Sequence, residues 1–459
     1  MIDIVKKVSL LKKIYAKLPP WLLLGYATYH SFRKYNRKYE YASPEQIKAL
    51  QLRHLKEIVA HAWKNIPGYR KHWETNKFHP DKLESLDDIQ RIPFITKEML
   101  QNNLEEFSYK KLKGLKKTTT GGSTGIPFSF YQQRRNGIIE LAFMHELWSR
   151  FYSEINYHVD ATILRGKKLK GPIGYDPLNG LILSSFDLVP NNIEKYIKAI
   201  EQYKTPILRA YPSSLHVFTS LIKEQGLNIK HQFKAIMLGS EKLYDFQKEP
   251  INEIFNSPLV NWYGHGEKAV LAGYCEHNEK FHSFSLYGIT EIIDSNNLEV
   301  SPGDIGEIVG TSFWNYATPF IRYKTKDYAK KGPDFCDQCG RYSQIIEEIQ
   351  GREHEFIVDK NKKLIALTGV SIICGTFSEL MQFRFIQQEI GKFTFKYIKK
   401  HGVDSVNTAG IQKALVDKLG DNFEIEFEEV NQISRTPSGK LMYLEQHLDI
   451  KKLLHNEQE

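Results

Sequence analysis

A segment rich in glycine and hydroxyl side chains, Thr118–Pro127, is the part of the sequence best suited to hold phosphate. It reads Thr-Thr-Thr-Gly-Gly-Ser-Thr-Gly-Ile-Pro. Hydroxyl groups donate hydrogen bonds to phosphate oxygens, and glycines let backbone N–H groups approach the same anion closely. The segment lacks the Gly-Lys-[Ser/Thr] ending of a P-loop. It predicts a polyphosphate clamp, and a flexible connection is the alternative.

A Cys-x-x-Cys pair, Cys336 and Cys339, predicts a metal-binding turn. Cys275 and His282 precede the pair at intervals suited to neighbouring strands, and thiolate and imidazole are the ligands that Zn²⁺ prefers. His277 is an alternative to His282. The remaining cysteine, Cys374, lies in an apolar run and is expected in the core. The sequence therefore predicts a structural zinc site.

The elements that position such groups follow from the hydrophobic pattern. Helical spacing dominates from Pro44 to Glu106. Further along, buried strands alternate with amphipathic helices, which indicates parallel strands joined by crossovers in a doubly wound α/β sheet. Ligands of such sheets bind outside the carboxyl ends of the strands. The predicted strands and the residues after them are Pro206–Tyr211 with Pro212 and Ser213, Ala235–Leu238 with Gly239–Glu241, and Leu259–Tyr263 with Gly264–Glu267.

After Tyr274 the pattern changes to closely spaced strands with Gly and Pro turns, which predicts an antiparallel β subdomain over about 275–350. Its strands are expected at Ser283–Tyr287, Glu291–Asp294, Glu307–Thr311 and Phe320–Lys324. We expect an N-terminal extension at 1–43, a large domain at 44–350 and a small α+β domain at 351–459.

Composition excludes several classes of protein. The 459 residues include 63 Lys or Arg and 54 Asp or Glu, a formal charge of +9. The mixture of signs argues against a nucleic-acid-binding arm. Four cysteines in so long a chain argue against a disulfide scaffold, and we expect a reducing, cytoplasmic location. Residues 1–20 have a basic amphipathic pattern, which predicts either a helix packed on the protein itself or peripheral contact with the cytoplasmic membrane face.

Five motifs in register resemble the signature series of the adenylate-forming enzymes, the superfamily of acyl-CoA synthetases, adenylation domains and luciferases. The resemblance runs from about Leu55 to Leu448. Within that superfamily the chain most resembles the phenylacetate–CoA ligase-like branch, especially its capsular-polysaccharide (CapK-type) members. The motifs are Thr118–Pro127, Asn261–Glu267, Tyr323–Asp327, Gly351-Arg352 and Thr436–Lys440.

The resemblance implies a site for ATP and Mg²⁺. The phosphate loop would be formed by Thr120, Gly121, Gly122, Ser123, Thr124 and Gly125, and the adenine pocket by Gly239, Ser240, Glu241, Asn261, Trp262, Tyr263, Gly264 and Gly266. Asp327 would bind the ribose, and Arg352, at the start of the C-terminal domain, would also bind the nucleotide. Glu267 and His265 would be catalytic, with Glu267 as the Mg²⁺ ligand. Lys440 is the expected catalytic residue, since its charge would stabilise the transition state of adenylation. Arg209, Tyr211 and Ser213 are candidates for the acid pocket.

Two departures from the family pattern bear on catalysis. Gly266 stands where the family usually has threonine, which removes a hydroxyl expected near the α-phosphate. Glu353 is followed by His354 where an acidic hinge pair is usual. The first concerns the geometry of adenylation, and the second concerns how a mobile C-terminal lid would rotate between half-reactions.

The expected function is an ATP-dependent ligase that activates a carboxylic acid as an acyl-adenylate and transfers the acyl group. Coenzyme A is one candidate acceptor, and an amine or hydroxyl in surface-polysaccharide assembly is another. The alternatives are AMP transfer to a hydroxyl-bearing acceptor and a non-catalytic scaffold that binds nucleotide and zinc. The acid and the oligomeric state stay open, with a homodimer as one candidate.

Overall fold

The computed structural model describes residues 18, 22–119, 128–167, 169–352, 356–366, 377, 379–436 and 439–448. The chain divides into two compact units, 1–158 with 262–349, and 159–261 with 350–459. We call them unit 1 and unit 2, and the division falls inside strands β8 and β14. The phosphate loop 120–125, the amphipathic segment 1–17, Glu353, His354 and Cys374 lie outside the described residues.

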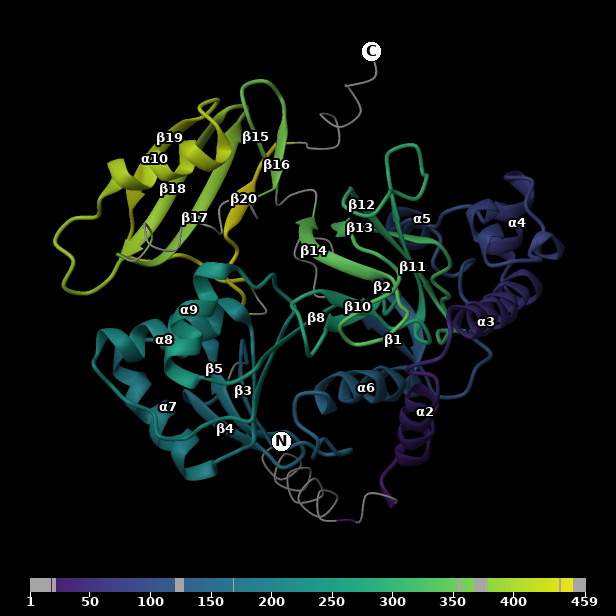
Figure 1. Ribbon diagram of the computed structural model, residues 1–459, viewed down its shortest axis with the longest axis horizontal. Coiled ribbons are helices and arrows are strands. Elements are labelled where there is room, and N and C mark those ends of the chain that lie inside the picture. Colours follow the sequence, from purple (N-terminus) through teal and green to yellow (C-terminus); the bar gives the residue numbers. More distant parts are fainter. Residues whose placement is uncertain are drawn as a thin grey trace. The chain divides into compact units, whose positions relative to one another are not determined.

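Unit 1 carries the predicted helical region and the predicted antiparallel strands (Figure 1). Its sheet has the order β11-β12-β13-β14-β10-β9-β8, and β1 pairs with β2 separately. The helices are α2 (Tyr26–Lys38), α3 (Pro44–Asn65), α4 (Pro67–Thr75), α5 (Lys97–Asn102) and α6 (Arg134–Ser149). The strands are β1 (Leu115–Thr119), β2 (Ser129–Gln133), β8 (Leu259–Gly264), β9 (Leu271–Tyr274), β10 (Phe281–Ser283), β11 (Gly288–Ile293), β12 (Ile305–Ser312), β13 (Tyr323–Lys331) and β14 (Ile345–Arg352).

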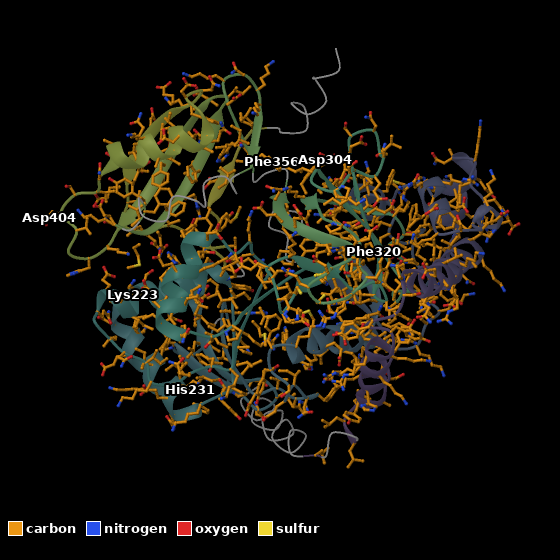
Figure 2. All side chains as sticks on the ribbon, in the orientation of Figure 1. Lys223, His231, Asp304, Phe320, Phe356 and Asp404 are labelled. Atoms are coloured by element: carbon orange, nitrogen blue, oxygen red, sulfur yellow. The ribbon has the colours of Figure 1, made fainter. Side chains whose placement is uncertain are left out.

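Sequence signals at the helix start, together with apolar packing, explain where α3 begins and what the buried sides of α3 and α4 contact. Ser43 accepts a hydrogen bond from the Gln46 N–H and forms a capping box, with Pro44 in the first turn of α3. The buried side of α3 and α4 packs with Phe313 and Phe320 in one apolar cluster. Phe320 lies inside this unit among many other side chains (Figure 2). The amphipathic pattern of 44–106 is therefore satisfied by burial against the β strands.

Two predicted strands of the β subdomain differ in position. Only Ser283 of the segment predicted at Ser283–Tyr287 belongs to a strand, because Phe284–Tyr287 is a turn closed by the Tyr287 N–H on the Phe284 carbonyl. The strand predicted from Phe320 begins at Tyr323, because Arg322 has a left-handed φ of 48°. The buried Arg322 guanidinium instead binds the Glu291 carboxylate.

Unit 2 contains the predicted alternation of strands and helices. Strands β3, β5, β6 and β7 are parallel, β4 pairs antiparallel with β5, and the order is β7-β6-β3-β5-β4. Helices cover one face of this sheet in a continuous apolar cluster. The elements are β3 (Ala161–Arg165), β4 (Ile173–Asp176), β5 (Gly180–Ser184), α7 (Pro190–Tyr203), β6 (Ile207–Ala210), α8 (Pro212–Glu224), β7 (Ala235–Gly239) and α9 (Asp245–Phe255).

The C-terminal part of unit 2 has a sheet of its own, β19-β18-β17-β20, with α10 against one face (Figure 1). Asp404 lies on the loop between β18 and α10 (Figure 2). The elements are β15 (Phe356–Val358), β16 (Leu364–Ala366), β17 (Leu380–Glu389), β18 (Lys392–Lys399), α10 (Thr408–Leu419), β19 (Glu424–Glu429) and β20 (Leu444–Gln446). The expectation of mostly parallel strands, an antiparallel β part and a small α+β part is confirmed. None of the described helices combines the length and apolar character needed to cross a bilayer.

Candidate active site and candidate metal centre

The turn that carries Lys440 lies against the carboxyl ends of the parallel strands of unit 2. Thr436 and Lys440 close the turn through backbone hydrogen bonds, 2.9 Å from the Thr436 N–H to the Lys440 carbonyl. The Lys440 ammonium donates to the Ser240 carbonyl at 2.6 Å and lies over the Tyr211 ring, 5.5 Å from its centroid. Ser240 directly follows β7, and Tyr211 directly follows β6. The sequence predicted both strand ends as part of the site, and the structure brings Lys440 to them.

Glycine is required at position 439 by a close approach of backbones. A Cβ at Gly439 would lie 2.3 Å from Gly166 Cα, and Gly439 has φ 85°. Its carbonyl accepts hydrogen bonds from the Ser185 hydroxyl at 3.3 Å and from the Arg435 guanidinium at 3.1 Å. Two residues further on, Leu441 donates its N–H to the Ser213 hydroxyl at 3.4 Å. These contacts fix the turn, and therefore Lys440, at the ends of β3, β5 and β6.

Glu241 supplies negative charge at the same place. Its carboxylate accepts the Ser213 N–H at 3.0 Å, and its other oxygen has no hydrogen-bond partner among the described residues. Burial raises the pKa of Glu241, while Lys440 and Arg435 act in the opposite direction. The carboxylate therefore lies near two cations without a direct ion pair to either in the described part of the chain.

Unit 1 presents the residues expected to bind ribose and Mg²⁺. The Tyr263 hydroxyl donates to the Asp327 carboxylate at 2.7 Å. Glu267 contacts the His265 ring nitrogen at 3.1 Å and accepts from the Tyr323 hydroxyl at 3.4 Å. Burial, and then the charge of Glu267, raise the pKa of Tyr323, so this phenol stays a donor. Two carboxylates therefore lie in unit 1, Asp327 within β13 and Glu267 just after β8, and each accepts a hydrogen bond from an aromatic hydroxyl.

Asp327 is displayed by an irregularity in the sheet. The pairing of β12 with β13 shifts between Glu307 and Val309, which face Tyr328 and Lys324. Three residues of β13 thus oppose one of β12, and Lys326 has a left-handed φ of 63°. Its N–H donates to the Glu307 carboxylate at 3.0 Å. The bulge turns the chain out of the ladder at the residue before Asp327.

The other expected site residues are found as follows. Asn261 is buried in β8, followed by Trp262, and Gly264 ends that strand; Gly266 lies in the turn after it. Arg352 ends β14. Arg209 lies in β6, and Ser213 is buried in the first turn of α8. The phosphate-loop residues Thr120–Gly125 lie outside the described residues. The described part of the candidate site therefore consists of the residues in and next to the strands.

Sequence reasoning missed Arg165, which ends β3. Its guanidinium lies over the face of Tyr211, 5.2 Å from the ring centroid. The apolar run Ala161–Leu164 before an Arg-Gly pair has the same form as the strand ends that the sequence did identify. A second omission is Glu140 of α6, which forms an ion pair with Lys268 next to the expected Mg²⁺ ligand.

Four side chains of unit 1 form a cluster with the composition of a zinc site. Cys275, His282, Cys336 and Cys339 each offer a ligand atom, and these atoms all lie within 4.8 Å of one another. Cys339 Sγ lies 3.8 Å from His282 Nδ1. A tetrahedral zinc ion with ordinary bond lengths would separate sulfur and nitrogen ligands by about 3.6 Å. The donor set and its spacing therefore fit a metal of this type.

The surroundings of the cluster suit a metal as well. Burial, with Arg150 and Arg341 nearby, lowers the pKa of His282 to about 4, so the ring is neutral and able to coordinate. Asn278 donates to Cys336 Sγ at 3.6 Å. The Arg341 guanidinium, one residue beyond the knuckle glycine, binds the Glu276 and Glu40 carboxylates. These bonds connect the cysteine turn to β9 and to the segment after α2.

Comparison with known proteins relates the chain to two named groups of proteins. Residues 357–446 match the family model of the CapK C-terminal domain. Protein CapK of Staphylococcus aureus is 24% identical over 402 residues, covering 85% of this chain and 87% of its own. The phenylacetate-coenzyme A ligase of Aromatoleum evansii is 26% identical over 354 residues, covering 73% and 77%. The resemblance to the CapK and phenylacetate–CoA ligase branch is confirmed.

Solved structures agree on the fold. A 2-hydroxyisobutyryl-CoA ligase in complex with 2-HIB-AMP has a TM-score of 0.72 at 17% identity, covering 92% of this chain and 94% of its own. The anthranilate CoA ligase AuaEII in complex with anthranoyl-AMP has a TM-score of 0.51 at 13% identity, covering 74% and 66%. The chain thus shares its architecture with adenylate-forming CoA ligases, and its phenylacetate-coenzyme A ligase relatives support a ligase.

Proposed function

We propose that the protein is an ATP- and Mg²⁺-dependent ligase that activates a carboxylic acid as an acyl-adenylate and then transfers the acyl group to an acceptor. In the first step a carboxylate oxygen of the acid attacks the α-phosphorus of ATP, and pyrophosphate leaves. The observation that carries the proposal is the position of Lys440, whose ammonium lies at the ends of β6 and β7. Parallel sheets bind their ligands at this edge.

Lys440 has the chemistry that the first step needs. Negative charge on the non-bridging and leaving oxygens changes as the α-phosphorus is attacked, and a fixed ammonium stabilises the transition state more than the ground state. The Ser240 carbonyl and the Tyr211 ring hold the ammonium, so little reorganisation is needed when substrate arrives. Removing Lys440 should therefore affect turnover more than affinity.

Asp327 and Glu267 have the chemistry to bind the nucleotide and its metal. Asp327 can accept hydrogen bonds from both ribose hydroxyls, since its carboxylate has acceptor sites beyond the one used by Tyr263. Glu267 provides the carboxylate oxygen that Mg²⁺ prefers, and Mg²⁺ would neutralise phosphate charge. Gly239, Ser240 and Glu241 would border the adenine from the end of β7, and the glycine- and threonine-rich loop Thr120–Gly125 would hold the outer phosphates.

The acceptor is proposed from the relatives. Coenzyme A is the acceptor named for the phenylacetate ligases. The likeness to protein CapK supports, as the other choice, an amine or hydroxyl acceptor in surface-polysaccharide assembly. The cysteine and histidine cluster is proposed to hold a structural Zn²⁺.

Pyrophosphate exchange tests the activation step. Radiolabelled pyrophosphate should enter ATP only when Mg²⁺ and a suitable carboxylic acid are both present. Mass spectrometry of a reaction with coenzyme A should then show an acyl thioester and free AMP. A product that retains AMP on a hydroxyl would instead establish nucleotidyl transfer. Absence of acid-dependent exchange across a broad panel would support the non-catalytic alternative, for which Gly266 is the sequence feature.

A further inference from the structure

Two arginines share one face of the unit 2 sheet. Ile163 of β3 pairs with Arg209 of β6, so the alternation of side chains puts Arg165 and Arg209 on the same face. The opposite face, which carries Leu164, Leu208 and Ala210, packs in the apolar cluster under α7 and α8. The arginines are therefore excluded from the helix-covered core and point to the other side of the sheet, at its carboxyl edge.

No carboxylate of the described residues forms an ion pair with Arg165. Among the same residues its Nε has no hydrogen-bond partner, and its guanidinium lies 5.2 Å from the centroid of Tyr211. A partly buried guanidinium without an anion is costly, because its hydration is lost without replacement. Burial and the neighbouring Arg165 charge lower the pKa of Arg209 to about 10. The two guanidinium groups thus repel each other where they lie.

The surplus of positive charge extends to the catalytic lysine. Tyr211 carries Arg165 and Lys440 within 6 Å of its ring centroid, at 5.2 and 5.5 Å. Arg435 lies beside the same turn, and Glu241 is the acid whose charge acts on Arg165. An anionic ligand at this place would lower the repulsion among these cations.

The position of Arg165 separates it from the expected nucleotide. Adenine is assigned to the end of β7, and in the strand order β7-β6-β3 the arginine is two strands away. Neighbouring strands are about 4.8 Å apart, so this separation is roughly 10 Å. Arg165 is therefore well separated from the assigned adenine position, and Arg209, on β6, lies one strand closer to it.

We propose that Arg165 and Arg209 bind a second anionic group on the carboxylic acid that the protein activates. The substrate would then be a dicarboxylic acid, or another acid with two negative charges, and not a purely apolar acid such as phenylacetate. Guanidinium groups suit this role because their forked N–H donors match a carboxylate in two places. The inference rests on the proposed function, which it deepens by naming the substrate class.

Binding measurements test the inference without turnover. Isothermal titration would compare succinate and glutarate with butyrate and valerate, which match them in length, in the presence of Mg²⁺ and α,β-methylene-ATP, which cannot release pyrophosphate. The parent should bind a dicarboxylate at least tenfold more tightly than its monocarboxylate partner. Arg165→Gln should remove that preference, and Arg165→Lys should retain part of it. Arg91→Gln, at an exposed arginine of unit 1, should behave as the parent.

Several outcomes would overturn the inference. Equal or weaker binding of the dicarboxylates by the parent would do so. A weaker affinity of Arg165→Gln for the nucleotide analogue, with its affinity for acids unchanged, would assign the charge to ATP. The proposed function is judged separately. If dicarboxylates bind in a way that depends on Arg165 but support no pyrophosphate exchange, the site for the anionic group stands and the ligase activity is contradicted. Pyrophosphate exchange that occurs only with monocarboxylic acids would support the ligase activity and contradict the inference.

Discussion

Strained backbone at single residues marks the candidate positions in each unit. Ser240, Lys268 and Lys326 have left-handed φ values of 69°, 60° and 63°. Non-glycine residues adopt this conformation at a cost of about 1–3 kcal/mol, and such positions cluster at functional sites. Each of the three lies next to a residue assigned to nucleotide or Mg²⁺ binding. Their strain presents the Ser240 carbonyl to Lys440 and turns Asp327 out of its ladder.

Asp327 gives a prediction at the residue scale. Asp327→Ala should raise the KM for ATP by about 10- to 100-fold, because hydrogen bonds to a charged group contribute about 1.5–3 kcal/mol. The KM for the acid should change little. Steady-state exchange rates at varied ATP measure the effect.

The matched control for this prediction is Asp304→Ala, at an exposed turn residue of unit 1 (Figure 2). The control should keep the parental KM. A KM for ATP that stays within twofold of the parent in Asp327→Ala would remove the residue from the nucleotide site.

Residue types and spacing could predict most single positions of the site. Tyr211, Ser240, Glu267 and Asp327 each follow or interrupt a strand, which a pattern of apolar runs can reveal. Arg165 could not be recognised in the same way. Its significance depends on the cross-strand register that brings it over Tyr211, and register is a tertiary property.

At the scale of elements, the cysteine turn is the feature most dependent on a ligand. The Cys336 N–H and carbonyl are bonded to the Arg341 carbonyl and the Gly340 N–H, at 3.0 and 2.7 Å. This short turn has a small apolar cluster of Cys275, Cys336 and Ile345 beneath it. Little burial stabilises the turn, so we expect the metal to contribute much of its folding energy.

Cysteine substitution tests that expectation. Parent protein should contain about one zinc per chain, and Cys336→Ser and Cys339→Ser should each lose most of it and lower the Tm. Plasma mass spectrometry and thermal unfolding measure the two effects. Cys374→Ser, at the cysteine that the sequence assigns to the core, should retain the metal. Zinc content that is equal in all four proteins would exclude this pair as ligands.

Helix α8 gives a prediction about pH. His216 contacts the Phe246 ring edge-on, with centroids 5.3 Å apart, and its Nδ1 has no hydrogen-bond partner among the described residues. Burial, and then Lys400, lower the pKa of His216 to about 3 from 6.5. Between these values the unfolded chain binds the proton and the folded chain does not, so the free energy of unfolding should fall as pH drops from 6.5 towards 3.

Urea unfolding at several pH values checks this sign. His216→Leu should flatten the fall in stability over that range, while His401→Leu, at an exposed position after β18, should leave the slope unchanged. Parallel pH profiles for the parent and His216→Leu would show that the ring does not titrate differently in the folded state.

Element order was predictable, whereas some boundaries were not. Parallel strands joined by helices leave a regular apolar pattern, so the ends of β6, β7 and β8 were predicted within one residue. The pattern is weaker in the antiparallel part, where Phe284–Tyr287 forms a turn despite its apolar residues. Apolar content there reflects burial of the turn and not extension of the chain.

At the scale of the whole molecule, the proposed activity depends on Lys440, a residue near the C-terminus that lies at the ends of strands formed much earlier in the chain. Within unit 2, the turn at Thr436–Leu441 contacts residues from the ends of β3, β5, β6 and β7. This contact map explains why the lysine can be so far along the chain from the other groups. The boundary at 350/351 and a rotating lid remain predictions.

Lys440 therefore offers the most direct measurement of the central claim. Acid-dependent exchange of pyrophosphate into ATP should fall about 10²- to 10³-fold or more in Lys440→Ala, with little change in the affinity for ATP. Lys413→Ala, at an exposed lysine of α10, should match the parent. Exchange that is equal in Lys440→Ala and the parent would contradict the account.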